Sequence, residues 1–281
     1  MSMSEVTSHT RVFALLGDPV SHSLSPTVQN AAMTDLNLDG VYVALKTGAE
    51  ELVGFMRGLA RSGGGGNITL PHKEKAATVL DVSSSAVKRT GACNTFWLAD
   101  GKIHGDNTDV AGFSGALETF LGGPPSGLRV LVLGAGGAAR AGLLALVEGD
   151  AQEIHLLNRA RDRARVVARR IGGTKVRVVD HVRDLDGKAF DLVVNTTCLG
   201  LQPDDALPLE LSQLSRVGGV LDVICRSGTT PFLEAARDLG IRAADGSEML
   251  IQQGAVAFER WWDRKPSLRI MRTALERRLR P

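Results

Sequence analysis

The sequence predicts an α/β protein built from two domains, and three observations support this. Strand-length apolar runs alternate with helix-length amphipathic stretches along nearly the whole chain, which is typical of a parallel sheet covered by helices on both faces. The length of 281 residues suits one large or two ordinary domains. The segment 121–127, LGGPPSG, is the strongest break in the pattern. We therefore expect one domain over residues 1–121 and a second over 122–246.

The first domain begins with the apolar run 11–17, which predicts a strand. Pro26 after Ser25 then marks a helix start, since serine caps free N–H groups and proline has none to satisfy. Asp100-Gly101 indicates the turn of an antiparallel pair. The further elements expected are helix 25–38, strand 41–47, helix 50–61, strand 66–70, helix 72–80, the pair 92–107 and helix 110–121.

A second α/β series follows the break. Its expected elements are strand 129–135, helix 137–148, strand 153–159, helix 160–171, strands 175–180, 191–197 and 218–224, and helix 230–239. Two long helices, 247–262 and 267–280, end the chain. Periodicity does not fix their place, and we expect part of 247–281 to return to the first domain.

Composition excludes several classes of protein. Lys and Arg number 33 against 31 Asp and Glu, and this small net charge argues against nucleic-acid binding driven by bulk charge. No apolar run approaches the roughly 18 residues of a membrane span, and the N-terminus lacks the apolar stretch of a signal peptide. The 3 cysteines form no CxxC, and the 6 histidines form no HxH or HExxH. We expect a cytoplasmic protein with no metal, no nucleic-acid partner and no membrane partner.

The segment 130–141, VLVLGAGGAARA, places glycines between an apolar strand and a helix, as a dinucleotide-binding loop requires. Gly134 can make the tight turn, and Gly136 lets the backbone approach a pyrophosphate, which the helix N-terminus also favours. Ala139 replaces the third glycine of the usual pattern. A glycine turn without a ligand is the alternative, but the context favours a Rossmann-type domain. The expected cofactor contacts in the loop are Gly134, Ala135, Gly136, Gly137 and Ala138.

Arginines follow the next strand, where NAD-specific proteins place a carboxylate for the ribose 2′-OH. The strand ends in Asn158 and Arg159, with Arg161 and Arg163 close behind. Guanidinium groups pair with a 2′-phosphate, so the pattern favours NADP over NAD as the cofactor. The alternative is that these arginines are solvated side chains of an arginine-rich helix.

Polar clusters lie at predicted strand ends of the first domain, where parallel sheets bind ligands. They contain Ser23 and Ser25, Thr69 and Lys73, Asn94, and Asn107 with Asp109. In an extended chain the two serine hydroxyls would face the same way. Such a set suits a small polyhydroxylated acid. Each member also has a structural alternative: a helix cap for Ser25, a turn for Asn94, and an ion pair for Lys73 with Asp109.

In combination these motifs resemble the shikimate dehydrogenase family over roughly residues 11–265. GDPVSHSLSP, NITLPHK, GACNT, GDNTD, LGAGGAARA, NRARDR, NTTCLG and DGSEMLIQQGAVAFERW occur in the family's order. The resemblance implies reversible reduction of 3-dehydroshikimate to shikimate with NADPH, on the route to aromatic amino acids. It implies Lys73 and Asp109 as the catalytic pair. It further implies substrate contacts from Ser23, Ser25, Thr69, Asn94 and Gln253, and cofactor contacts from Asn158, Arg159, Arg163 and Thr196.

The residues suggest the same chemistry. A ketone that accepts hydride builds negative charge on its oxygen, which needs a proton and a stabilising charge. Lys73 can supply both if its pKa lies near working pH. Burial would lower that pKa and Asp109 would oppose the lowering, so the sequence leaves the balance open. We expect Asp109 to orient Lys73 and bind a substrate hydroxyl.

Four positions depart from the family's usual pattern: Gln29 for histidine, His72 for a large apolar residue, Ala160 for threonine and Cys225 for tyrosine. Loss of the tyrosine removes a phenol donor and a packing plane, so quinate or an amino-substituted analogue stays open as the substrate. A non-catalytic metabolite or NADP sensor of the same fold also stays open, although the retained Lys73 and Asp109 argue against it. We expect Cys225 to be a packed small residue rather than a reactive thiol. The sequence carries no signature of oligomeric state and leaves a homodimer open.

Overall fold

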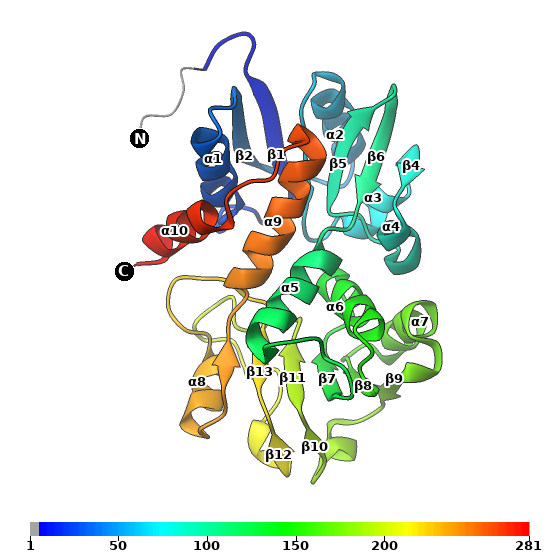
Figure 1. The fold of residues 1–281 in the computed structure, drawn as a ribbon. Helices are drawn as coiled ribbons and strands as arrows, with labels where there is room; N and C mark the ends of the chain where they lie inside the picture. Colours follow the sequence, from blue (N-terminus) through cyan, green and yellow to red (C-terminus); the bar gives the residue numbers. More distant parts are fainter. Residues whose placement is uncertain (1–5, 281) are drawn as a thin grey trace. The chain divides into compact units, whose positions relative to one another are not determined.

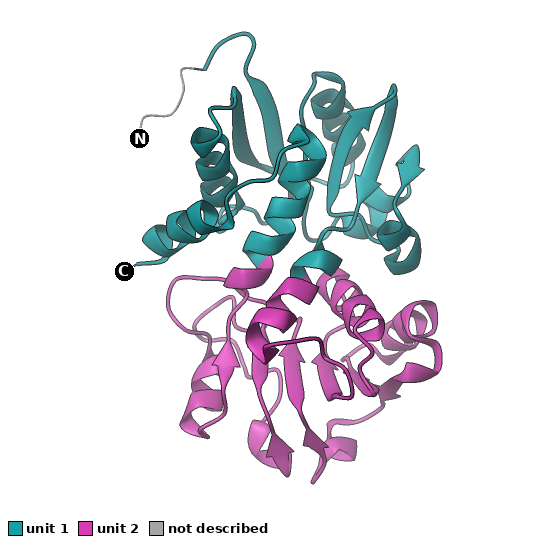
Figure 2. Cartoon of the chain, viewed as in Figure 1, with its two compact units in different colours: residues 1–112, 250–280 teal, residues 113–249, 281 magenta. Residues whose placement is uncertain are grey.

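The computed structural model describes residues 6–280 and has the expected α/β class (Figure 1). Residues 6–112 with 250–280 form a first compact unit, and residues 113–249 form a second (Figure 2). The division falls inside helix α5 (Asp109–Leu121), ahead of the glycine- and proline-rich segment 121–127. Helix α9 (Ser247–Trp262) also crosses from one unit to the other, so each crossing lies within a continuous helix.

The first unit is built around one six-stranded sheet. Its other elements are β1 (Arg11–Gly17), α1 (Ser25–Asp35), β2 (Gly40–Lys46), α2 (Leu52–Arg61), β3 (Gly65–Ile68), α3 (Lys73–Ala77), β4 (Val82–Ser83), α4 (Ser85–Thr90), β5 (Thr95–Ala99), β6 (Lys102–Asp106) and α10 (Leu268–Leu279). The strand order is β2-β1-β3-β5-β6-β4. β1 runs parallel to β2 and β3, whereas β5 is antiparallel to both β3 and β6.

Strand β1 shows how the sequence places helices on both faces of this sheet. Successive side chains of a strand point to opposite faces. Ala14 and Leu16 pack in one buried cluster with Leu52 and Met56 of α2. Phe13, on the other face, stacks on Trp261 of α9 with ring centroids 5.0 Å apart. α2 and α9 therefore cover opposite faces of the sheet, and Figure 1 shows α9 in front of it.

The second unit has the strand order of a dinucleotide-binding fold. Its remaining α-helices and strands are β7 (Arg129–Leu133), α6 (Gly137–Glu148), β8 (Glu153–Leu157), α7 (Arg161–Ile171), β9 (Val176–Val179), β10 (Ala189–Phe190), β11 (Leu192–Asn195), β12 (Arg216–Val217), β13 (Val220–Asp222), α8 (Pro231–Asp238) and β14 (Ala243–Ala244). The main sheet runs β14-β13-β11-β7-β8-β9, and all its pairs are parallel. The order reverses between β7 and β11, which is where such sheets bind ligands. The predicted Rossmann-type architecture is confirmed.

The structure differs from the sequence prediction mainly in short elements. Helix α4 and the two-residue strands β4, β10, β12 and β14 were not predicted, because none spans enough residues to show a period. The stretch 72–80 forms only the five-residue α3. The first sheet is mixed rather than parallel, because the predicted turn at Asp100-Gly101, where both residues have positive φ, reverses the chain between β5 and β6.

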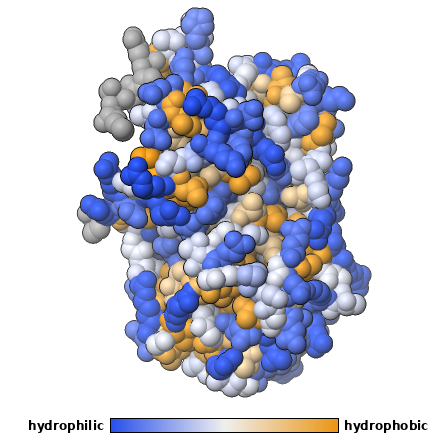
Figure 3. Space-filling view, viewed as in Figure 1, coloured by the Kyte–Doolittle hydropathy of each residue, from blue (hydrophilic) through white to orange (hydrophobic). Residues whose placement is uncertain are grey.

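The surface carries polar and charged side chains over most of the face in view, with apolar residues in small separate groups (Figure 3). Across residues 6–280, no helix combines the length and the apolar character needed to cross a bilayer.

Candidate active site

Strand pairing in the first unit brings four chain segments to one edge of the sheet. Ile68 at the end of β3 lies beside Leu16 near the end of β1. Thr95 at the start of β5 pairs with Asn67 of β3 on one side and with Asp106, the last residue of β6, on the other. The segments that follow β1, β3 and β6 and the one that precedes β5 therefore meet. These segments carry the polar clusters singled out in the sequence.

Lys73, Asp109 and Asn94 form the centre of this edge. Lys73 is the first residue of α3, and Asp109 is the first residue of α5. The Lys73 Nζ donates to Asp109 Oδ2 at 2.5 Å, and Asn94 Nδ2 donates to Asp109 Oδ1 at 2.8 Å. The Lys73 and Asp109 side chains are only 15% and 7% exposed, so the pair is largely withdrawn from water, where charge-assisted bonds are strong. An ammonium has three N–H donors, so Lys73 can serve Asp109 and a bound ligand together.

The orientation of the Asn94 amide is set by Thr108, a residue the sequence analysis missed. Thr108 N donates to Asn94 Oδ1 at 2.7 Å, which turns Nδ2 toward Asp109. Thr108 Oγ1 contacts the same amide, accepting from Nδ2 at 2.9 Å. Gln253 Oε1, from α9, lies 3.4 Å from Asn94 Nδ2. The signal for Thr108 was its place between the two residues noted in GDNTD, but its amide and hydroxyl act on a neighbour distant in sequence.

The two serines lie where β1 leads into α1, although not in the conformation expected. Leu24, not Ser25, is the N-cap of α1, and no side chain caps the helix. Ser23 Oγ accepts from Ser25 N at 3.2 Å, so the segment is a turn and not an extended chain. The interpretation of parallel hydroxyls in an extended segment was wrong, and so was the helix cap for Ser25. Because Ser25 does not cap the helix, its hydroxyl is available for another role.

Thr69, Asn107 and His72 also belong to the segments that meet at this edge. Thr69 N donates to Leu16 O at 2.9 Å, and a Cβ on Gly17 would collide with the Thr69 methyl group, so Thr69 is fixed beside the end of β1. Asn107 instead donates to Thr90 Oγ1 at 3.0 Å, so its amide nitrogen is used outside the Lys73–Asp109 pair. His72 is buried and its Nε2 lies 2.7 Å from Thr47 O, a hydrogen bond that makes the polar ring tolerable there.

The glycine loop of the second unit has the features that a pyrophosphate site requires. Gly134 has a φ of +109°, and a Cβ there would come within 2.8 Å of Thr196 Oγ1. At Gly136, the N-cap of α6, a Cβ would meet nothing within 4 Å, and no side chain caps this helix. The N–H groups of the first turn are therefore open to an anion. Thr196 follows β11, and its hydroxyl donates to Leu133 O of β7 at 2.6 Å, directly at the point where the strand order reverses.

The predicted phosphate-binding residues lie beside this loop. Asn158 follows β8, and its Nδ2 donates to Ala160 O at 2.8 Å, which shapes the turn into α7. Arg159 is exposed in the same turn. Arg163 Nε donates to Ala135 O at 3.0 Å, so this side chain reaches from α7 to the glycine loop. Arg161 NH2 lies 3.3 Å from His181 Nδ1. The clamp for a 2′-phosphate stays a prediction.

Cys225 is not placed for nucleophilic catalysis. Burial raises the pKa of Cys225 to about 11, and its Sγ lies 3.4 Å from Ser247 Oγ, which agrees with a packed residue. Within the described range, His, Cys, Asp and Glu side chains form no group of three that could hold a metal ion.

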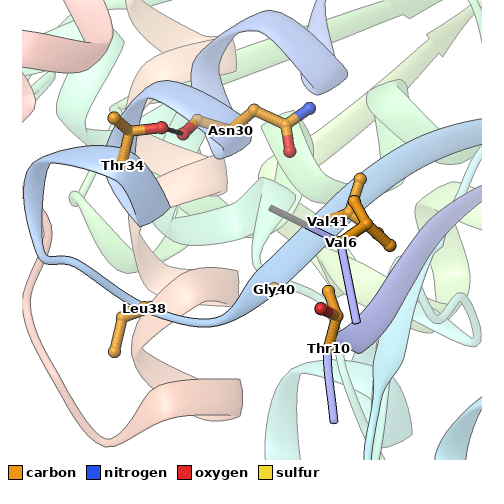
Figure 4. A pocket seen from close by; sticks show the side chains of 7 residues that line it. All are labelled: Val6, Thr10, Asn30, Thr34, Leu38, Gly40 and Val41. Atoms are coloured by element: carbon orange, nitrogen blue, oxygen red, sulfur yellow. Dashed lines mark hydrogen bonds between the residues drawn. The ribbon is translucent and has the colours of Figure 1, made fainter. Parts of the chain in front are cut away.

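The first unit also has a hollow that none of the site residues described above lines (Figure 4). It is lined by Val6, Thr10, Asn30, Thr34, Leu38, Gly40 and Val41. None of these side chains is ionisable. The Asn30 amide is engaged with the backbone of Tyr42, donating to its carbonyl and accepting from its N–H. The lining of the hollow therefore contains no side chain that could act as a general acid or base.

Comparisons with known proteins identify the family. Residues 15–96 match the family model described as Shikimate dehydrogenase substrate binding domain, residues 121–198 match Shikimate / quinate 5-dehydrogenase, and residues 246–276 match Shikimate 5'-dehydrogenase C-terminal domain. A relative from Rubrobacter xylanophilus, named Shikimate dehydrogenase (NADP(+)), is 39% identical over 98% of this chain and 99% of its own. This chain belongs to the shikimate dehydrogenase family.

Solved structures of the family agree with the fold. The shikimate 5-dehydrogenase from Thermus thermophilus, crystallised with NADP(H) and shikimate, has a TM-score of 0.84 and 37% identity, over 95% of this chain and 98% of that one. The family resemblance seen in the sequence is confirmed. A 5-ketofructose reductase of Gluconobacter also matches, at a TM-score of 0.82 and 29% identity over 95% of this chain and 98% of its own.

Proposed function

We propose that this chain catalyses the NADP-dependent, reversible oxidoreduction of shikimate and 3-dehydroshikimate. The observation that carries this is the withdrawn Lys73–Asp109 pair, held by Asn94 at the strand ends of the first unit. A paired lysine ammonium beside neutral donors suits proton transfer to a ketone oxygen in a small polyhydroxylated acid. The full-length match to relatives named Shikimate dehydrogenase (NADP(+)) supports the same substrate and cofactor.

In the direction of reduction, Lys73 Nζ holds the proton that the developing alkoxide takes, and its positive charge stabilises that oxygen beforehand. In the reverse direction, the neutral amine accepts the hydroxyl proton. Asp109 orients Lys73 through Oδ2, and it accepts a hydrogen bond from a substrate hydroxyl. Ser23, Ser25, Thr69, Asn94 and Gln253 supply the neutral donors and acceptors for the carboxylate and remaining hydroxyls.

NADPH supplies the hydride when bound. The glycine loop fits its pyrophosphate, because Gly136 leaves room for close approach and the start of α6 presents open N–H groups. Gly134, Ala135, Gly137, Ala138 and Thr196 line the same turn. Arg159 and Arg163 supply positive charge for the 2′-phosphate, with Asn158 shaping the turn that carries them. No carboxylate occupies the end of β8, which favours NADP over NAD.

A related polyhydroxylated substrate is the second candidate. The family model over residues 121–198 is described for shikimate and quinate together, and a 5-ketofructose reductase shares the fold. The same Lys73–Asp109 chemistry would serve any of these substrates, since only the groups around the reacting carbon differ.

The test is the absorbance of reduced nicotinamide with purified protein. Shikimate and quinate are each offered with NADP and with NAD, and 5-ketofructose is offered with NADPH. We expect rapid reduction with shikimate and NADP. Faster turnover in another arm would change the substrate or cofactor but keep the mechanism. An absence of turnover in every arm, together with thermal stabilisation by NADP, would favour a non-catalytic sensor.

A further inference from the structure

Asp222 is a fully buried carboxylate of the second unit that the predicted site does not use. It ends β13 and is 0% exposed. Three donors point at it: Thr230 Oγ1 at 2.7 Å to Oδ2, and Asn195 Nδ2 at 3.0 Å and Ile224 N at 3.1 Å, both to Oδ1. Burying a charge is costly unless it is well hydrogen-bonded, so this carboxylate needs an explanation beyond packing.

Asn195 is the residue of β11 that pairs with Asp222. Its side chain links Asp222 to the turn that follows β11. The same Asn195 Nδ2 also donates to Leu199 O at 3.0 Å. Its Oδ1 accepts from Thr197 N at 3.0 Å and from Thr197 Oγ1 at 2.7 Å. Because a carboxylate only accepts, Asp222 permits only one of the two orientations of the Asn195 amide, and that orientation closes the turn 195–199.

This turn packs against the glycine loop. Thr196 Oγ1 donates to Leu133 O, the residue before Gly134. A Cβ on Gly134 would lie 2.8 Å from Thr196 Oγ1 and 3.1 Å from the Thr197 methyl group, so the two segments are in close contact. A chain of contacts thus runs from Asp222 through Asn195 and the turn to the loop that approaches the pyrophosphate.

We propose that Asp222 is a positioning residue for NADP: through the Asn195 amide it fixes the turn 195–199 against the Gly134 loop. This rests on the proposed function, because it takes the glycine loop as the cofactor site. Asp222 does not touch the cofactor. Its effect is to hold the wall of the site in the bound geometry before NADP arrives, which lowers the ordering cost of binding.

The main test is Asp222→Leu, compared with wild type in steady-state kinetics. Leucine is close in size to aspartate but accepts no hydrogen bond, so the Asn195 amide loses its bond to β13 and keeps only its bonds within the turn 195–199. We expect KM for NADP to rise about tenfold, the size of a lost hydrogen bond to a charged group. The KM for shikimate and kcat at saturating NADP should stay within about twofold, because the Lys73–Asp109 pair lies in the other unit.

Thr230→Val is the matched control. Valine keeps the shape of threonine but loses the hydroxyl that binds Asp222 Oδ2 and caps α8. This variant should have a lower Tm and an unchanged KM for NADP, because the bond from Asn195 to the other carboxylate oxygen stays. Equal increases in KM for NADP in Thr230→Val and Asp222→Leu would overturn the proposal, since general destabilisation would then explain both.

Two further variants separate the outcomes. Asp222→Asn keeps an acceptor for Asn195 and Ile224 and can donate to the Thr230 hydroxyl, so its KM for NADP should stay within about twofold of wild type. Should Asp222→Leu not fold, Thr197→Val opens the same turn and leaves Asp222 in place. An unchanged KM for NADP in Thr197→Val would then overturn the inference. If the wild-type protein shows no turnover with NADP and no increase in Tm on adding it, the proposed function is wrong, and so is this inference.

Discussion

Lys73 and Asp109 owe their proposed chemistry to what surrounds them. Lys75 is on the same short helix, yet its side chain is 42% exposed and bonds only to Ala49 O and to exposed Glu50 among the contacts described for it. Lys73 lies two residues earlier, is withdrawn from water and holds a carboxylate that is itself held by Asn94. The difference between the two lysines is one of position at the strand ends. A charge in such a place acts on a substrate far more strongly than one in water.

We predict that Lys73→Ala lowers kcat by about 10²–10⁴-fold, the usual contribution of a positioned proton donor. Its dissociation constant for shikimate, measured by titration calorimetry, should change much less. Lys75→Ala, a matched change on the same helix, should leave both values near wild type. A variant in which KM rises while kcat is kept would show that Lys73 only binds substrate.

The thiols should differ sharply in reactivity. Burial raises the pKa of Cys93 to about 12 and that of Cys225 to about 11, so neither forms thiolate at neutral pH, whereas Cys198 is exposed. We predict that a maleimide labels Cys198 alone in the native chain and all three thiols after unfolding, as read by mass spectrometry. Rapid native labelling of Cys225 would mean that its surroundings open in solution.

At the scale of elements, the sequence correctly predicted those strands and turns that depend on a local residue pattern. Strand β1 matches its expected range, and the turn at Asp100-Gly101 forms because both residues adopt positive φ. The role of Thr108 was not predicted, although the Asp100-Gly101 turn brings it close to Asn94, because the pattern does not show which way the Asn94 amide faces. The role of Asp222 was not predicted because it acts on Asn195 across two parallel strands, whose register no local pattern reveals. Ser25 shows the converse error: a serine before proline is a typical cap, but here Ser25 is the first residue of the helix and Leu24 is the N-cap.

The glycine loop gives two variants with opposite expectations. Gly134→Ala places a side chain at φ +109° and close to Thr196, so the free energy of unfolding should fall by about 1–3 kcal/mol. Gly136→Ala meets open space and extended backbone, so the Tm of the free protein should hardly change. Its KM for NADP should nevertheless rise about tenfold, because the methyl group stands where the pyrophosphate approaches.

Calorimetry with and without NADP checks both changes. Gly136→Ala should lose much of the Tm gain that NADP gives to wild type. If it keeps that gain in full, Gly136 does not face the cofactor, and the approach of the pyrophosphate must be placed elsewhere.

At the scale of the whole chain, each unit has its own core and its own part of the proposed chemistry. The proposed substrate site in the first unit includes Gln253, which helix α9 brings back from far along the sequence. The pairing of Phe13 with Trp261 anchors that helix. Periodicity could show that residues 247–262 form a helix, but not which sheet the helix would cover. That choice depends on aromatic packing between the two ends of the chain.

The free energy of unfolding should depend on pH through the buried carboxyl group of Asp222. Burial, with a smaller contribution from Asp245, raises its pKa from 3.8 to about 6, despite three hydrogen bonds that lower it. Between these two values the folded chain binds a proton that the unfolded chain has lost, so folding is favoured as pH falls. The charged form is penalised in full above about pH 6, and the penalty fades as pH falls toward 4.

We therefore predict that wild type gains stability relative to Asp222→Asn as pH falls from 7 to 4, by about 2–3 kcal/mol. The variant lacks the titrating group, so subtracting its profile removes the titration of the other carboxylates. The three tryptophans, Trp97, Trp261 and Trp262, all lie in the first unit. Urea unfolding must for this reason be followed by circular dichroism, which also reports the second unit. Parallel profiles across this range would mean that Asp222 titrates alike in the folded and unfolded chain, and that its three donors offset its burial completely.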